Sequence, residues 1–205
     1  MKKYLIFDLD GTLLKSDEEI NTLIYNYIKK NIDPELIDTA RYLIENNQWM
    51  SIKETMTTLI DDKNDANKHY LAITWMIDDL QDQVKFFDWV QDKIKELSLK
   101  YTLFLSTWNS DKFANEMLSH GWVDHCFHKI LWSSFILKSP EHIDELATYS
   151  WDDDFYDKAV FIWDWQRDRF IAKSKNIDFI HIWSENIDTY EIQTVTQIDT
   201  ILEQF

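Results

Sequence analysis

Residues 3–14 read KYLIFDLDGTLL. The apolar run Tyr4–Phe7 is typical of a strand that is buried inside a parallel sheet. Two carboxylates follow it, Asp8 and Asp10, and in extended backbone both point to the same side at the carboxyl end of the strand. Gly11 comes next, and glycine adopts backbone angles that other residues resist. Close carboxylates at a strand end suit a divalent cation, and one of them can attack a phosphoryl group.

Composition limits the class of protein and its partners. The chain has 205 residues, enough for one core or for a core domain with a small accessory domain. Its formal net charge of -16 and its pI of about 4.6 argue against a nucleic-acid or anionic-membrane surface, which needs clustered positive charge. The single cysteine excludes a disulfide framework, and no apolar run reaches the ~18 residues of a membrane span. We therefore expect a cytoplasmic protein with no nucleic-acid or membrane partner.

The spacing of apolar residues divides the chain into two parts. Within residues 15–83 they recur every three or four positions, which predicts four amphipathic helices that pack on one another. From residue 84 onward, short apolar strands alternate with helices, the pattern of a parallel sheet with crossover helices. We expect an α/β domain of the Rossmann-like type from residues 1–14 and 84–205, and a small α-helical domain at 15–83. The alternative is that these helices form further layers of one domain.

Polar side chains suited to phosphoryl chemistry follow the second and third predicted strands of the sheet. Ser106 and Thr107 end the strand at residues 101–105, where a hydroxyl and backbone N–H groups can hold phosphoryl oxygens. Lys138 lies just ahead of a predicted helix, where an ammonium group can offset negative charge on a phosphoryl group. Ligands of open α/β sheets bind beyond the carboxyl ends of the strands, so these residues are candidates for one site.

The fourth predicted strand, residues 159–163, ends in Asp164, and Asp168 follows four residues later. A carboxylate at this strand end can complete a magnesium shell together with Asp8, because that ion prefers hard oxygen ligands.

Taken together, these stretches resemble the four motifs of the haloacid dehalogenase-like hydrolases, a superfamily made mostly of magnesium-dependent phosphatases. The first motif, hhhhDxDGT, is matched by residues 5–12. The second is an apolar strand ending in Ser or Thr, the third is a lysine often followed closely by proline, and the fourth is hhhhDxxxD. The resemblance implies a sheet of order 3-2-1-4-5, with an α-helical cap inserted between the first and second motifs.

The resemblance also implies a reaction, the hydrolysis of a small phosphomonoester. By analogy with the family, Asp8 attacks the phosphorus and forms an aspartyl phosphate. Asp10 protonates the leaving oxygen and then activates water for the second step. Ser106, with Thr107 as the alternative, and Lys138 steady the transferring group.

For the metal, the resemblance implies Mg²⁺ held by Asp8, the backbone carbonyl of Asp10 and Asp164. Asp168 is the remaining candidate near the metal, where it would orient Lys138 or a metal-bound water.

Two alternatives to a phosphatase stay open. One is a phosphomutase of the same fold, and the other is a non-catalytic binding or regulatory protein. The second gains weight from Trp163, which stands where the family usually has glycine, and from the scarcity of glycine: 2 in the chain, against about fourteen at an average usage of ~7%. Because neighbouring strand residues face opposite sides, we expect Trp163 to point away from the site and to pack beneath a helix.

The sequence does not identify the substrate or the oligomeric state. In this family the cap selects the substrate. Charge alone marks the candidate substrate-binding residues in and near the cap, which are Lys15, Arg41, Lys53 and His69.

Overall fold

A computed structural model of the chain describes residues 1–46, 51–133, 138–164, 166–182, 190–192 and 195–203. Internal contacts divide the chain into two compact units. The first, which we call the sheet unit, is Met1–Lys15 with Lys85–Phe205, and the second, the helical unit, is Ser16–Val84.

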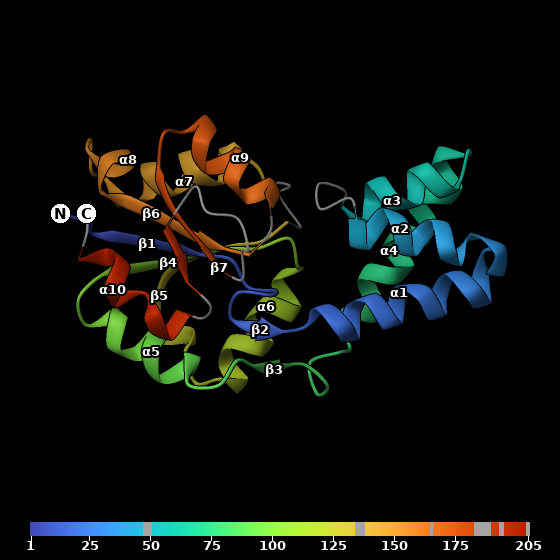
Figure 1. Cartoon of the computed structure of the whole chain (residues 1–205), viewed down its shortest axis with the longest axis horizontal. Coiled ribbons are helices and arrows are strands. Elements are labelled where there is room, and N and C mark those ends of the chain that lie inside the picture. The colour runs from blue at the N-terminus through green and yellow to red at the C-terminus, as the bar shows by residue number, and fades with distance from the viewer. Residues whose placement is uncertain (47–50, 134–137, 165, 183–189, 193–194, 204–205) are drawn as a thin grey trace. The chain divides into compact units, whose positions relative to one another are not determined.

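The sheet unit is built on six parallel strands in the order β5-β4-β1-β6-β7-β8 (Figure 1). Their bounds are β1 Tyr4–Phe7, β4 Thr102–Ser106, β5 Phe127–Leu131, β6 Ala159–Trp163, β7 Asp178–Ile182 and β8 Tyr190–Ile192. The first five have the predicted order 3-2-1-4-5. The sequence did not predict β8 at the edge, because three residues with a central glutamate give no apolar run.

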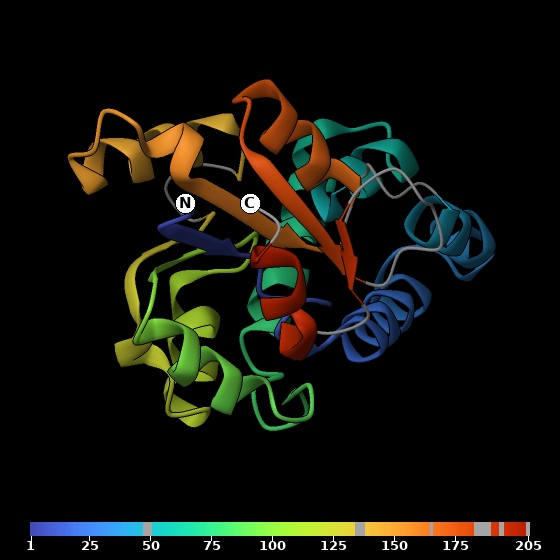
Figure 2. The same ribbon diagram turned by 60° about the vertical axis from the view of Figure 1, so that its left-hand side comes forward.

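Helices cover both faces of this sheet (Figures 1 and 2). On one face lie α5 (Val90–Ser98), α6 (Asp111–His120) and α10 (Asp199–Leu202), and on the other lie α7 (Pro140–Ser150), α8 (Phe155–Lys158) and α9 (Gln166–Ser174). Two short antiparallel strands, β2 (Leu14–Lys15) and β3 (Lys85–Phe86), and two 3₁₀ turns, η2 (Asp124–Cys126) and η3 (Val195–Gln197), complete the unit.

The core of the sheet unit explains why its central strands are apolar throughout. All four residues of β1 are buried, and alternate residues face opposite layers of helices. Tyr4 and Ile6 belong to a cluster with Phe104, Phe161 and side chains of α7, α8 and α9. Because the core holds both faces of β1, the polar residues that follow the strand are held at a fixed edge of the sheet.

The helical unit contains α1 (Asp17–Asn31), η1 (Pro34–Leu36), α2 (Ile37–Asn46), α3 (Ile52–Leu59) and α4 (Lys63–Ile77). Ser51 and Glu54 form the capping box that the sequence indicates, and Asp62 caps α4. Inside the unit, the buried His69 hydrogen-bonds through Nδ1 to the hydroxyl of Tyr27 at 2.9 Å. His69 therefore has a structural partner within its own unit.

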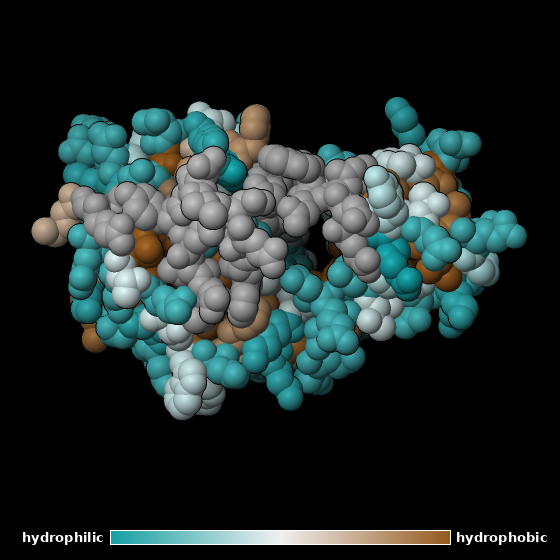
Figure 3. Space-filling view, in the orientation of Figure 1, coloured by the Kyte–Doolittle hydropathy of each residue, from teal (hydrophilic) through white to brown (hydrophobic). Residues whose placement is uncertain are grey.

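Hydrophilic side chains dominate the described surface in Figure 3, as expected for a chain with 37 acidic and 21 basic residues. None of the helices in the described residues is both long enough and apolar enough to cross a membrane.

Candidate active site at the carboxyl ends of the strands

The chain leaves β1 through a tight turn that requires glycine at Gly11. The backbone N–H groups of Leu13 and Leu14 both donate to the carbonyl of Leu9, at 2.8 and 3.0 Å. Gly11 has φ +63°, a left-handed angle that favours glycine. A Cβ at Gly11 would lie 1.9 Å from Asp164 Oδ2. Glycine is therefore needed for the angle and also for the close approach of the carboxylate that follows β6.

A lysine and two carboxylates form a buried cluster beside this turn. Lys138 Nζ lies 2.8 Å from Asp8 Oδ1 and 2.5 Å from Asp168 Oδ2. Exposed fractions are 5% for Asp8, 1% for Lys138 and 0% for Asp168. The backbone N–H of Leu9 also donates to Asp8 Oδ1, at 2.8 Å, so this carboxylate is fixed from two directions.

The charges in this cluster shift the pKa of two members. Burial lowers the pKa of Lys138, but the charges of Asp168 and Asp8 outweigh it and raise the pKa above its ordinary value. Burial raises the pKa of Asp168 to about 8, against the opposing effect of Lys138 and with a further rise from Asp8. Lys138 is therefore an ammonium group at neutral pH, held between two acidic groups.

Asp164 follows β6 and is held at both its side chain and its backbone. Thr12 Oγ1 donates to Asp164 Oδ1 at 3.2 Å, and His181 Nε2 lies 2.7 Å from the backbone carbonyl of Asp164. We did not predict a role for His181, because a histidine within the apolar strand β7 matches no motif. Its contact becomes visible only when β6 and β7 are paired, with Trp163 opposite His181.

The last residue of β4 and the residues just after it make hydrogen bonds of their own. Ser106 Oγ lies 2.9 Å from His142 Nδ1 on α7, and both side chains are 1% exposed. Thr107, also buried, accepts a hydrogen bond at Oγ1 from the backbone N–H of Asn109 at 3.1 Å. Asn109 in turn donates through Nδ2 to Asp10 Oδ2. No motif indicated His142 or Asn109, because each lies near a helix start, where a polar residue is ordinary.

A family match decides the classification. Residues 5–182 match the family model described as haloacid dehalogenase-like hydrolase. The chain belongs to this family. None of the curated proteins searched matches it.

Solved structures show the same fold at low sequence identity. A proposed phosphoglycolate phosphatase of Lactobacillus plantarum has a TM-score of 0.80 at 17% identity, covering 100% of both chains. A haloacid dehalogenase-like family hydrolase of Streptococcus pneumoniae has a TM-score of 0.75 at 19% identity, covering 98% of each chain. The proposed hydrolase YfnB of Bacillus subtilis, described as bound to magnesium, has a TM-score of 0.72 at 16% identity, also covering 98% of each chain.

The donor set of this family member fits a hard divalent cation with few protein ligands. Within the described ranges, no group of three or more His, Cys, Asp or Glu side chains is placed to hold a metal ion. Magnesium, however, is commonly bound by one or two carboxylates with water and other oxygens completing the shell. A carboxylate oxygen of Asp164 lies close to the glycine turn that follows Asp8. Asp168 is instead hydrogen-bonded to Lys138.

Trp163, which stands at the family's usual glycine, is 0% exposed. It packs in the cluster that β1, β4 and β6 share with α7–α9, and its ring centroid lies 4.9 Å from that of Phe179. The expectation that this side chain packs beneath a helix is confirmed. Its Nε1 has no hydrogen-bond partner among the described residues, an unsatisfied donor in an otherwise apolar site.

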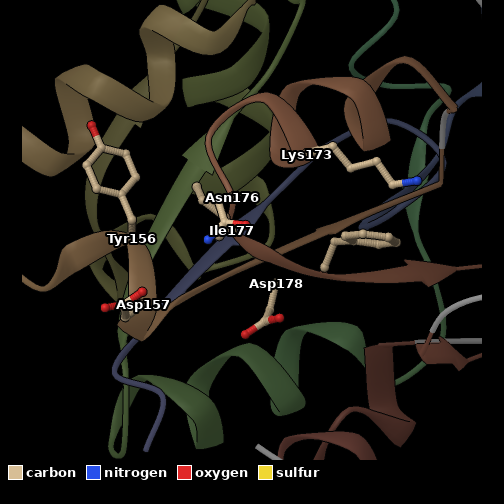
Figure 4. Close-up of a pocket in the computed structure, with 7 residues that line it drawn as sticks. Tyr156, Asp157, Lys173, Asn176, Ile177 and Asp178 are labelled. Carbon is tan, nitrogen blue, oxygen red and sulfur yellow. The ribbon is translucent and has the colours of Figure 1, made fainter.

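A cavity of about 320 Å³ lies elsewhere in the sheet unit (Figure 4). Residues of α8, α9 and β7 line it, among them Tyr156, Lys173 and Asp178. Asp178 is the first residue of β7, so this cavity is at the amino ends of the strands and apart from Asp8. It is not the candidate active site.

Proposed function

We propose that this hydrolase is a magnesium-dependent phosphatase that acts on a small phosphomonoester through a phosphoryl group carried by Asp8. The observation that supports this most is the contact of 2.8 Å between Lys138 Nζ and Asp8 Oδ1 in a buried cluster. A carboxylate nucleophile must approach an anionic phosphoryl group, and the ammonium group offsets the repulsion between the two.

The proposed reaction has two steps. In the first, Asp8 forms a bond to phosphorus while the bond to the leaving oxygen breaks and Asp10 gives that oxygen a proton. In the second, water attacks the phosphorus, Asp10 takes the proton of the water, and Asp8 is released as a carboxylate. Asp168 keeps Lys138 in place through the bond of 2.5 Å.

Asp8, the backbone carbonyl of Asp10 and Asp164 are the groups that we propose to hold Mg²⁺. When bound, this ion supplies positive charge that stabilises the phosphoryl oxygens in the transition state.

The hydrogen bonds after β4 support Thr107 more than Ser106 as the hydroxyl that contacts the phosphoryl group. Thr107 Oγ1 accepts the N–H of Asn109, which leaves its own O–H to donate. Ser106 is instead paired with His142 on α7. Thr107→Ala is therefore expected to raise KM or lower kcat more than Ser106→Ala does.

The test is a phosphate-release assay with and without magnesium. The panel includes an aryl phosphate, phosphoglycolate, sugar phosphates and nucleoside monophosphates, since two similar structures are described as phosphoglycolate phosphatases, one proposed and one predicted. Hydrolysis is expected to stop with chelator and to fall at least ~10³-fold in Asp8→Asn. The matched control is Asp153→Asn, an exposed carboxylate just before α8.

The same assay separates the alternatives. Full turnover by Asp8→Asn contradicts the assignment of the nucleophile. Transfer of the phosphoryl group to a second sugar phosphate, in place of its release, identifies a phosphomutase. No turnover of any member of the panel favours the non-catalytic alternative.

A further inference from the structure

Asn109 links the loop after β4 to the turn after β1. It lies three residues beyond the end of β4, and its side-chain amide donates to Asp10 Oδ2 at 2.5 Å. Both residues are half-buried. A hydrogen bond to a carboxylate is stronger and more directional than one between neutral groups. The contact therefore fixes the orientation of one carboxylate oxygen of Asp10.

The backbone of Asn109 is itself held on both sides. Its N–H donates to Thr107 Oγ1 at 3.1 Å, and its carbonyl accepts the N–H of Ser133 at 3.1 Å. Ser133 Oγ in turn donates to the carbonyl of Thr107 at 3.2 Å and accepts the N–H of Lys138 at 3.1 Å. The loops after β4 and β5 thus form one hydrogen-bonded network that reaches from Lys138 to Asp10.

We propose that Asn109 is a positioning residue that sets the direction in which Asp10 transfers its proton. The inference rests on the proposed function, in which Asp10 gives a proton to the leaving oxygen. With Oδ2 held by the amide, rotation of the carboxylate about its χ2 angle is restricted. Proton transfer needs donor and acceptor within hydrogen-bond reach, so a freely rotating Asp10 is correctly placed for a smaller fraction of the time.

The test uses two substrates that differ in their need for that proton. An alkyl phosphate has a poor leaving group, which must be protonated, whereas 4-nitrophenyl phosphate has a good one, which leaves as an anion. Asn109→Ala is expected to lower kcat at least ~10-fold on the alkyl phosphate and much less on the aryl phosphate, with KM nearly unchanged on both. Asn109→Gln keeps the amide donor and should recover part of the loss. Asn115→Ala, an exposed residue of α6, is the matched control.

Several outcomes would overturn this role. They are an equal loss on both substrates, a change confined to KM, or no recovery with glutamine. An inactive wild-type enzyme counts against the proposed function instead. In that case a crystal structure of Asn109→Ala tests the positioning role without any measurement of turnover. An Asp10 side chain that keeps its rotamer in this variant contradicts that role.

Three tryptophans occupy an unexpected backbone conformation. Among the described residues, the non-glycine residues with positive φ are Trp89 (66°), Trp122 (54°), Trp151 (52°) and Asn176 (52°). Asparagine often adopts this conformation, but for a bulky residue it is an outlier. Trp122 and Trp151 lie at the carboxyl ends of α6 and α7, where glycine is the usual left-handed residue. Trp89 is the N-cap of α5, and its left-handed angle likewise favours glycine.

These three tryptophans are exposed, so burial of their side chains does not offset the cost of the left-handed backbone angle. Trp89 is 75% exposed, Trp122 is 77% exposed and Trp151 is 94% exposed, although tryptophan is on average a highly buried residue. A fourth tryptophan, Trp163, stands where the family usually has glycine. The chain as a whole has 10 Trp and only 2 Gly. Tryptophan thus occurs at several positions for which backbone geometry or the family pattern favours glycine.

We infer that these tryptophans stand at codons that the cell carrying this gene reads as glycine. UGA is read as tryptophan in some genetic codes and as glycine in others, so one codon accounts for both the surplus of tryptophan and the shortage of glycine. The inference is independent of the proposed function, since it rests on backbone angles, exposure and composition. Under this inference residue 163, just before Asp164, is also glycine, as the family pattern has it.

Peptide mass spectrometry on the protein from its own cells tests the inference directly. Glycine is expected at positions 89, 122 and 151, and tryptophan there would overturn the inference. Stability tests the geometry behind it. Trp89→Gly, Trp122→Gly and Trp151→Gly should each raise the ratio of folded to unfolded protein about 5- to 30-fold. Trp75→Gly, at an exposed site inside α4, should lower that ratio, and a loss in the first three variants would contradict the inference.

Discussion

Two clusters of lysine and aspartate lie at opposite ends of the same sheet. At the carboxyl ends of the strands, Lys138 is held between Asp8 and Asp168, and all three are buried. At the amino ends, Asp152 is held between Lys158 Nζ at 2.9 Å and Lys3 Nζ at 3.1 Å. The side chains of Lys158 and Lys3 are 33% and 54% exposed, so this second cluster is in contact with water.

The two clusters differ in the cost of taking their charged groups out of water. Removing charges from water costs several kcal/mol for each ion, so a buried ion pair is weak evidence of stabilisation. With a pKa of about 8, Asp168 is mostly protonated at neutral pH, so Lys138 and Asp8 are the charged pair of the buried cluster. Ion pairs in contact with water lose little solvation when they form, and they contribute little to the stability of the fold. The cost of burying the cluster around Lys138 is consistent with our proposal that Asp8 is the nucleophile.

Lys138→Met should have the largest effect on stability. It leaves the buried acidic groups of Asp8 and Asp168 without a cation, and breaking a buried pair costs about 3–5 kcal/mol. Urea unfolding in the presence of chelator measures this cost. Lys158→Met is the control from the water-exposed cluster and should cost far less. Equal losses in the two variants would show that the clusters do not differ in the way we describe.

Gly11→Ala should have the next largest effect, because the turn beside the buried cluster has no room for a side chain. The left-handed angle costs about 1–2 kcal/mol in a residue with a Cβ, and Asp164 must also move. We expect a loss of about 2 kcal/mol or more in unfolding free energy and a fall of ~10²-fold in activity. In an Asp164→Ala background the same change should cost only the backbone part, and an unchanged cost there would rule out the clash.

Asp168→Asn should destabilise the protein much less than Lys138→Met does. The substitution keeps the shape, its amide oxygen can still accept from Lys138, and the charged pair of Lys138 and Asp8 stays in place. We expect a change of about 1 kcal/mol in unfolding free energy, as for one altered hydrogen bond. A loss as large as that of Lys138→Met would show that hydrogen-bond geometry, not charge, dominates the cluster.

The sequence predicted the elements that depend on local patterns. Apolar runs predicted the strands, the resemblance to the family predicted the order of five of them, and the motif around Asp8 predicted the glycine turn. The motifs did not reveal the hydrogen-bond partners that hold the site residues, namely Asn109, His142 and His181. Each is a single polar residue in a segment that has an ordinary local explanation. Their contacts depend on strand register and helix placement, which no single segment encodes.

For Trp163, two sequence patterns bore on different aspects of the same residue. The family pattern marked it as a departure next to a proposed metal ligand, while strand alternation placed it in the core, as the structure has it. The left-handed tryptophans were not predicted at all, because backbone angles at helix ends follow from packing that the sequence pattern does not describe.

Asp152→Asn tests the water-exposed cluster and should have the smallest effect. Hydrogen bonds from Lys158, Tyr4 and Lys3 hold the pKa of Asp152 well below its ordinary value. Because the folded pKa is depressed, the carboxylate contributes stability above its unfolded pKa of about 3.9, and that stability is lost as pH falls. The asparagine variant should therefore be less stable than the wild type at pH 5 to 7, and the difference should shrink below about pH 4. Urea unfolding at a series of pH values measures this, with Asp153→Asn as the control. A difference that stays constant with pH would mean that Asp152 acts through its shape and not through its charge.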